Sequence, residues 1–324
     1  MPRSDIGVTR RFGRSPLPSQ PTELNLRTLL LHNPGAGKAH PDREELLTQF
    51  EAAGFSPTYQ STKDKRYKDA LRKKWDLVIV AGGDGTVIRV ARNLRDRSIP
   101  LAILPLGTAN NVASVLDLLD RDIEAIIAGL KGAPLKRLDV GLARGPWGKR
   151  RFLEAVGFGS IAAAIAHAEG KDSEPRVARK KTLGIDMGRE ELQEHLQEAE
   201  ASRFEVDVDG EVFAGEFLLV EILNISRTGP ALPMSFLAES DDGQLDIVFL
   251  FKNDRAPMLK WLEDPEGQIC PATVRRGREV RLKWEHGHAR IDDRVYVAPK
   301  SASTVKIAIE EKSLSILVPK RSGS

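Results

Sequence analysis

The sequence contains a single cysteine, Cys270, and no long apolar run. One thiol can form neither an internal disulfide nor a multi-cysteine metal site, which fits a reducing compartment, and we expect a cytoplasmic protein. Nowhere do about 18 consecutive apolar residues occur, so no transmembrane segment is expected. A lipid ligand would therefore be met at the membrane surface, peripheral to the inner face.

The chain also lacks a large excess of either charge. It has 49 Lys and Arg residues and 46 Asp and Glu residues, for a net charge of +3. This balance gives no indication of nucleic acid binding. Residues 1–22 carry four arginines among Pro and Ser, without the apolar core of a secretory signal, and predict a disordered basic tail. Such a tail would contact an anionic bilayer only weakly.

The usual nucleotide-binding fingerprints are also missing. Residues 35–40 lack the third glycine of the dinucleotide motif, and no Gly-x-x-x-x-Gly-Lys-Ser/Thr occurs. Ser226 and Ser235 lack a glycine elbow, and the six histidines show no metal-ligand spacing. These absences exclude a P-loop NTPase and a Rossmann dehydrogenase, and they leave a serine hydrolase without support.

What is present is a regular alternation of short apolar runs and helical patterns, in a chain long enough for two domains. The runs span residues 27–32, 76–81 and 100–105, and the helical patterns span residues 42–53, 86–94 and 110–119. Such alternation predicts βαβ units and a parallel sheet that is covered on both faces. Phosphate sites in these sheets lie where strand carboxyl ends meet helix N-termini.

From about Leu138 the pattern changes to strands separated by turn residues. Strand patterns span residues 204–210, 216–224, 245–251 and 279–284. They predict a second, mostly antiparallel domain. A charged, helical stretch at residues 167–201 interrupts them, and we expect it to contain a mobile loop around residues 171–181.

Three glycine-containing turns, at residues 32–38, 82–86 and 105–111, each follow an apolar run of the first domain. Glycine lets backbone N–H groups approach an anion closely, and a following helix N-terminus adds a positive dipole end. Three converging turns therefore suggest a cradle for a polyphosphate. Any one of them alone is equally well read as a tight strand-to-helix turn.

Asp84 lies in the middle turn, where its carboxylate would repel a phosphate unless a divalent cation bridged the two. Magnesium bound to ATP supplies such a bridge. The alternative is that Asp84 is a turn residue or a helix cap.

These turns carry a family resemblance. The segments Asn-Pro-Gly-Ala-Gly-Lys (33–38), Gly-Gly-Asp-Gly-Thr (82–86) and Pro-Leu-Gly-Thr-Ala-Asn (105–110) have the order and spacing of the diacylglycerol kinase catalytic domain. Further landmarks follow at residues 208–211, 242–246 and 291–292, so that the likeness covers nearly everything after residue 25. The chain thus resembles the diacylglycerol kinase and sphingosine kinase superfamily, whose enzymes transfer phosphate from ATP to lipid hydroxyls.

The resemblance implies an α/β nucleotide-binding domain with a parallel sheet, joined to a mostly antiparallel β-sandwich that takes the lipid substrate. The expected ATP-binding domain spans residues 23–137, the β-sandwich spans residues 138–305, and residues 306–319 return to the first domain. The oligomeric state stays open, with a homodimer among the options.

The resemblance also assigns ATP to the three turns and magnesium to Asp84. The residues expected to bind the nucleotide are Asn33, Pro34, Gly35, Gly37, Thr62, Gly82, Gly83, Asp84, Gly85, Thr86, Gly107, Thr108 and Asn110. The Asp242-Gly243-Gln244 turn resembles a structural magnesium site of bacterial relatives, although Asp-Gly also forms ordinary hairpin turns. Asp84, Asp242 and Gln244 are therefore the candidate metal ligands.

Two departures from the family pattern concern catalysis. Family members often have Asp-Gly-Glu where this chain reads Asp292-Asp293-Arg294, and their Glu is the general base for the lipid hydroxyl. Arginine cannot accept a proton at neutral pH, so we expect Asp293, next to Asp292, to act instead. Arg89 likewise stands where many relatives carry a Glu.

Three functions follow from these observations. The first is an ATP- and magnesium-dependent lipid kinase, with Asp84, Asp292 and Asp293 as candidate catalytic residues. The second is a nucleotide- or lipid-binding protein that kept the fold and lost its base at Arg294. The third is an NAD kinase, which shares the Gly-Gly-Asp-Gly-Thr turn.

Overall fold

The computed structural model describes residues 26–37, 41–168 and 184–321. The predicted basic tail at residues 1–22 and the predicted mobile loop at residues 171–181 lie outside these residues. No helix in the described part of the chain is long and apolar enough to cross a membrane.

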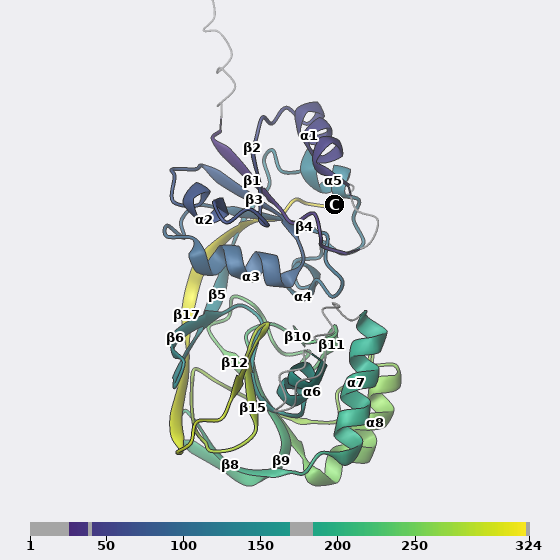
Figure 1. Cartoon of the computed structure of the whole chain (residues 1–324), viewed down its shortest axis with the longest axis vertical. Helices are drawn as coiled ribbons and strands as arrows, with labels where there is room; N and C mark the ends of the chain where they lie inside the picture. Colours follow the sequence, from purple (N-terminus) through teal and green to yellow (C-terminus); the bar gives the residue numbers. More distant parts are fainter. Residues whose placement is uncertain (1–25, 38–40, 169–183, 322–324) are drawn as a thin grey trace, which may run out of the picture.

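The first part of the chain forms a parallel sheet flanked by helices, at the top of Figure 1. In spatial order its strands are β4 (Leu101–Pro105), β3 (Leu77–Gly82), β1 (Thr28–His32) and β2 (Thr58–Ser61). Its helices are α1 (Arg43–Ala52), α2 (Tyr67–Ala70), α3 (Asp84–Asn93), α4 (Asn111–Ser114) and α5 (Ile123–Ala128). Every residue of β1, β3 and β4 is buried, as expected for strands covered on both faces.

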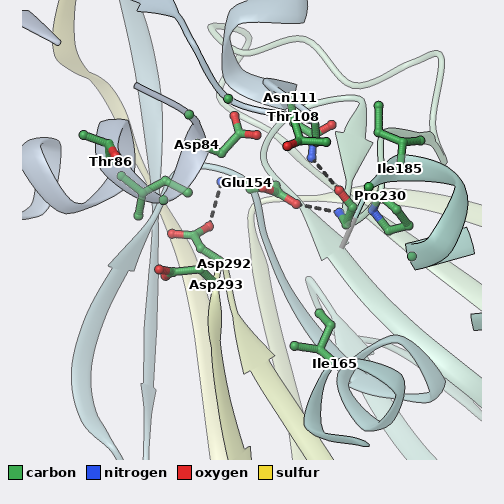
Figure 2. Close-up of a pocket in the computed structure, with 18 of the residues that line it drawn as sticks. Asp84, Thr86, Thr108, Asn111, Glu154, Ile165, Ile185, Pro230, Asp292 and Asp293 are labelled. Atoms are coloured by element: carbon green, nitrogen blue, oxygen red, sulfur yellow. Dashed lines mark hydrogen bonds between the residues drawn. The ribbon is translucent and has the colours of Figure 1, made fainter. Parts of the chain in front are cut away.

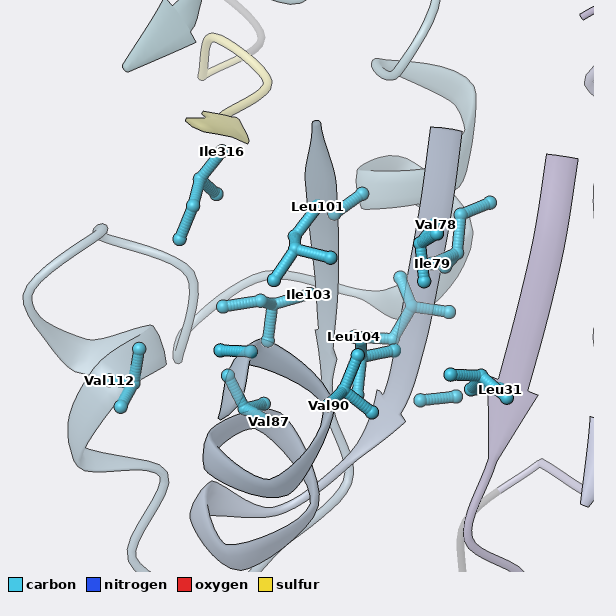
Figure 3. Close-up of a cluster of buried hydrophobic side chains, with 14 of the residues drawn as sticks. Leu31, Val78, Ile79, Val87, Val90, Leu101, Ile103, Leu104, Val112 and Ile316 are labelled. Carbon is cyan, nitrogen blue, oxygen red and sulfur yellow. The ribbon is translucent and has the colours of Figure 1, made fainter. Parts of the chain in front are cut away.

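Apolar side chains at helical spacing fix α3 on this sheet. Figure 3 shows Val87 and Val90 of α3 in the same buried cluster as Ile103 and Leu104 of β4. Fully burying one such side chain contributes roughly 1.5–3 kcal/mol. The prediction of a long helix over residues 110–119 is wrong, because α4 ends at Ser114 and Asp117 adopts a left-handed conformation with φ of 57°.

The second part is built mainly from antiparallel strands and lies below the first in Figure 1. Its strands are β5 (Leu135–Gly145), β6 (Gly148–Phe152), β7 (Ala155–Gly159), β8 (Ser202–Val208), β9 (Glu211–Leu223), β10 (Arg227–Thr228), β11 (Leu232–Pro233), β12 (Leu245–Phe251), β13 (Thr273–Gly277), β14 (Glu279–Trp284), β15 (His288–Ile291), β16 (Arg294–Val297) and β17 (Ser303–Leu317). Its helices are α6 (Ser160–Ala168), α7 (Ile185–Glu198) and α8 (Arg255–Glu263), with the 3₁₀ turn η1 (Lys252–Asp254) before α8.

Strand β9 is central to this second part, because its two faces belong to different cores. Val220 and Ile222 face an aromatic core that contains Phe158 and Trp284. Leu219 and Leu223 alternate with them and pack in the cluster that holds α6, α7 and α8. By the same period of two, Glu221 lies on the helix-covered face, where a charge has to be compensated.

Strand β17 connects the two parts. It pairs with β14 and with β5 along most of its length, and at its end Ile316 pairs in parallel with Leu101 of β4. Figure 3 shows Ile316 beside Leu101 in the first core. The expected fold class, a parallel α/β unit joined to a mostly antiparallel one, is confirmed.

Candidate functional site

A cavity of about 780 Å³ lies where the two parts of the chain meet. All three glycine turns reach it from the first part, and residues of α6, α7 and the β15–β16 turn reach it from the second. The predicted site residues on its wall are Asn33, Gly35, Gly37, Gly83, Asp84, Gly85, Thr86, Gly107, Thr108, Asp292 and Asp293.

The second and third turns are packed directly against each other. A Cβ on Gly83 would lie 2.8 Å from Cα of Gly107, and a Cβ on Gly107 would overlap Cα of Gly83. Asn110 closes the third turn, because its side chain accepts from the Gly107 amide and donates to the Gly107 carbonyl, both at 2.9 Å. Glycine is therefore required at these two positions by packing alone.

Gly85 is different, since its backbone borders open space. The nearest atom to a Cβ placed there is Oδ2 of Asp293, at 3.4 Å. Gly85 belongs to the first turn of α3, whose dipole favours an anion at this end. Asn33 supports the turn from the side by donating from Nδ2 to the Thr86 hydroxyl at 3.2 Å.

Asp84 points its carboxylate at the start of α4. Its Oδ1 accepts from the Val112 amide at 2.9 Å, so Asp84 ties α3 to the third turn. Burial raises the pKa of Asp84, and the amides of Val112 and Asn111 partly oppose the rise. One carboxylate oxygen of Asp84 thus binds the start of α4, as a helix-capping residue does. Asp84 also lines the cavity (Figure 2).

The apolar wall of the cavity comes from two helices. The alanine-rich sequence of α6 favours a helix, and its lining residues fall at i, i+3, i+4 and i+7 on one face: Ile161, Ala164, Ile165 and Ala168. From α7, the lining residues Ile185, Gly188 and Leu192 keep the same spacing. Figure 2 shows Ile185 beside Pro230 and Ile165 farther along the cavity.

Comparisons with known proteins agree with this geometry. The profile of the diacylglycerol kinase catalytic domain matches residues 27–143. The diacylglycerol kinase of Bacillus subtilis is 24% identical over 295 residues, covering 88% of this chain and 87% of that protein. That of Staphylococcus carnosus is 25% identical over 245 residues, covering 72% and 76%. The chain is thus similar to diacylglycerol kinases along most of its length.

The fold is shared as well. A crystal structure of a diacylglycerol kinase from Bacillus anthracis superposes with a TM-score of 0.63 at 21% identity, covering 91% of this chain and 97% of that one. All three glycine turns lie within the matched residues 27–143, and they converge at the cavity.

Some residues predicted to bind the nucleotide lie off the cavity wall. Pro34 is exposed, and Gly82 packs against Thr86. Thr62 is buried just after β2, and its amide donates to the His32 carbonyl at the end of β1. Asn110 acts through the Gly107 turn described above. The roles of the three turns in binding remain predictions.

Asp292 and Asp293, which precede Arg294 in the segment that departs from the family pattern, have different surroundings. The carboxylate of Asp292 is buried and accepts from the amides of Glu154 and Ala155, and from Arg92 at 2.8 Å. Asp293 is about half exposed on the cavity wall, with Oδ1 3.5 Å from Arg92 Nη1. Arg294 is exposed at the start of β16 and is not among the residues that line the cavity.

The predicted structural metal site lies apart from the cavity. Asp242 accepts from the Gln244 amide at 2.9 Å and forms an ion pair with Arg276, whose guanidinium supplies the positive charge. Among the described residues, no group of three or more His, Cys, Asp or Glu side chains is arranged around a common metal position. Asp242 is thus paired with an arginine in this structure, and its role as a metal ligand stays a prediction.

The cavity residues that the sequence reasoning missed include two buried charged ones, Glu154 and Arg290. Both are buried, and Arg290 forms an ion pair with Glu221 at 2.7 Å. Burial raises the pKa of Glu154 to about 8, with Arg290 opposing the rise. The sequence did contain a signal for Glu154, because it is the one charged residue in the apolar run 152–158. A carboxylate in a buried run needs a compensating partner or serves a function.

Proposed function

We propose that the protein is an ATP- and magnesium-dependent kinase that phosphorylates a lipid hydroxyl. The observation that carries the proposal is the composition of one cavity, which has glycine turns and carboxylates on one side and the apolar faces of α6 and α7 on the other. A triphosphate suits the first side and an alkyl chain suits the second.

On this proposal, backbone amides at the start of α3, around Gly85, hold phosphate oxygens. Magnesium that enters with ATP would be held by Asp84 together with phosphate oxygens, and it would neutralise phosphate charge. A single carboxylate suits this role, because Mg²⁺ is commonly bound by one or two carboxylates plus substrate phosphates. The chain's own part is then to position the acceptor hydroxyl and take its proton.

We consider three of the carboxylates on the cavity wall as candidates for taking that proton: Asp84, Asp293 and Glu154. Asp292 has its oxygens occupied by Arg92 and backbone amides. Asp293, the candidate from the sequence, reaches the cavity but shares Arg92 with Asp292.

The test is phosphate transfer from labelled ATP by the full chain. Purified protein is incubated with magnesium and vesicles that carry diacylglycerol, phosphatidylglycerol or a sphingoid base, with NAD in a parallel reaction. We expect the label in one lipid and none in NAD. Label in NAD alone would replace the lipid kinase by an NAD kinase.

The binding-protein alternative is favoured by one observation, the exposed arginine at position 294 where relatives carry their base. It predicts that the wild type binds magnesium-ATP in calorimetry but labels no lipid. Arg294→Glu then separates the two functions. Gain of transfer by this variant over an inactive wild type would establish a lost base, whereas an active wild type removes the alternative.

A further inference from the structure

The backbone of Glu154 is hydrogen-bonded on both its amide and its carbonyl side. Its amide donates to Asp292 at 2.8 Å, and its carbonyl accepts from the Asn224 amide at 2.9 Å. The side chain of Asn224 also donates to the carbonyl of Leu153 at 2.9 Å. The residue is thereby fixed on both sides before β7 begins.

The side chain of Glu154 is oriented through one of its two oxygens. Oε1 accepts from the Gly229 amide at 2.7 Å and from the Thr228 hydroxyl at 3.1 Å, and Arg290 Nη1 lies 3.7 Å away. No donor to Oε2 is found in the described part of the chain. Because Glu154 lines the cavity, Oε2 is the oxygen left for a ligand.

The position of Glu154 also suits a group that acts between the nucleotide and the acceptor. Figure 2 shows it between Asp84, on the side of the glycine turns, and Asp292. The Gly229 amide donates to Oε1 of Glu154, and the Gly229 carbonyl accepts from the Asn111 side chain of α4 at 3.0 Å. The carboxylate is thus connected to the third glycine turn.

Asp293, the other candidate, is less well prepared. It is 51% exposed, and its Oδ1 lies 3.5 Å from Nη1 of Arg92. Glu154, by contrast, is buried, and its carboxylate is oriented by Thr228 and Gly229.

We propose that Glu154 is the catalytic base of the kinase reaction, an inference that rests on the proposed function. As the acceptor oxygen forms its bond to the γ-phosphorus of ATP, the bond from that phosphorus to the bridging oxygen breaks. The electron pair of the broken bond stays with ADP, and the hydroxyl proton passes to Oε2 of Glu154. Thr228 and Gly229 are positioning residues that keep Oε2 toward the acceptor.

The charges around Glu154 give this base a recognisable pH dependence. Burial raises its pKa to about 8, Asp84 on α3 and Asp292 before β16 act in the same direction, and Arg290 on β15 opposes them. Turnover should therefore rise with pH across the neutral range as Glu154 loses its proton.

The test compares Glu154→Gln with Glu221→Gln in the full chain. Both remove a buried carboxylate near Arg290, but only Glu154 lines the cavity. We expect Glu154→Gln to lower turnover by roughly a hundred- to ten-thousandfold and to flatten its rise with pH, with ATP affinity unchanged in calorimetry. Glu221→Gln should keep the rise with pH.

Two further variants keep the outcome decisive. Glu154→Asp retains the charge but withdraws the oxygen by one methylene, so it should turn over slowly and retain the rise with pH. Asp293→Asn should stay within about tenfold of wild type. Full activity of Glu154→Gln, or loss in Asp293→Asn alone, would overturn the assignment while leaving the kinase intact. A wild type that labels no acceptor at all would instead refute the proposed function.

Discussion

Asp292 and Asp293 are adjacent in the sequence, yet the fold gives them different chemistry. Asp292 adopts a left-handed conformation with φ of 50° and turns its carboxylate inward onto backbone amides and Arg92. Asp293 points outward, where half of its side chain meets solvent. Only the second is free to contact a substrate, and the buried Glu154 competes with it for that role.

Asp84→Asn should lower kinase turnover on the order of a hundredfold or more, because it removes a charge proposed to position magnesium. The fold should persist, since the asparagine oxygen can still accept from the Val112 amide that Asp84 now binds. Turnover at several magnesium concentrations and a thermal melt measure the two effects. Near-normal turnover with unchanged magnesium dependence would remove Asp84 from the mechanism.

Glu154 should also make stability fall with rising pH. Its pKa is raised from 4.5 to about 8 in the folded protein, so its contribution is fully present below about pH 4.5 and is lost as pH rises through about 8. Between pH 7 and 9, wild type should therefore lose more unfolding free energy than Glu154→Gln, which carries no charge there. Denaturant unfolding at both pH values measures the difference.

Asp246→Asn is the control for that measurement. Burial raises the pKa of Asp246 to about 6, so its carboxyl is already ionised at pH 7. This variant should show the wild-type loss between pH 7 and 9. Equal losses in all three proteins would mean that Glu154 does not titrate in this range.

At the scale of elements, the glycine turns combine two functions that their sequences do not distinguish. Gly83 and Gly107 let two strand-to-helix turns touch, which places the start of α3 beside the third turn. Gly85 leaves the first turn of α3 open to the cavity. The same residue type therefore serves packing at two positions and ligand approach at a third.

Paired alanine substitutions should separate these functions. Gly107→Ala places a Cβ against the Gly83 backbone and should cost about 1–3 kcal/mol of unfolding free energy. Gly85→Ala has room for its Cβ and should leave stability unchanged or slightly raised, while ATP affinity falls about tenfold. Melts and calorimetry test both. Unaltered ATP affinity of Gly85→Ala would place the phosphates elsewhere.

At the scale of the whole molecule, Arg92 of α3 joins the two parts at the cavity. Its guanidinium donates to the carbonyls of Arg151 and Ile291 and to the carboxylate of Asp292. Glu310 of β17 pairs with Arg97 and Arg151 nearby. These contacts fix the position of α3 relative to the β15–β16 turn that carries Asp292 and Asp293.

Arg92→Met should destabilise the protein by about 3–5 kcal/mol, because it leaves the buried Asp292 without its cation. The double variant Arg92→Met/Asp292→Asn should recover part of this loss, since the uncompensated charge is then gone. Denaturant unfolding of the two single variants and the double variant gives the coupling. Additive losses would show that the pair does not act as a unit.

Much of the structure of the first part could be predicted from the sequence, because the patterns that specify its strands, helices and turns are local. The apolar runs at 76–81 and 100–105 became β3 and β4, and Asp42 begins α1 with a capping box, as its position before the helical pattern suggests. Glycine turns after buried strands also predicted where the cavity would have its polar side. Strand period, helix period and turn chemistry depend on neighbours only a few residues apart.

The tertiary structure alone decided which buried charges meet beside the cavity. Glu154, Glu221 and Arg290 are separated by 67 and 69 residues along the chain, yet β7, β9 and β15 pair side by side and bring them together. No local pattern encodes that pairing, because strand order depends on how whole faces are buried. The sequence by itself determined the glycine turns and the likeness to diacylglycerol kinases, whereas long-range strand pairing determined which carboxylates line the cavity.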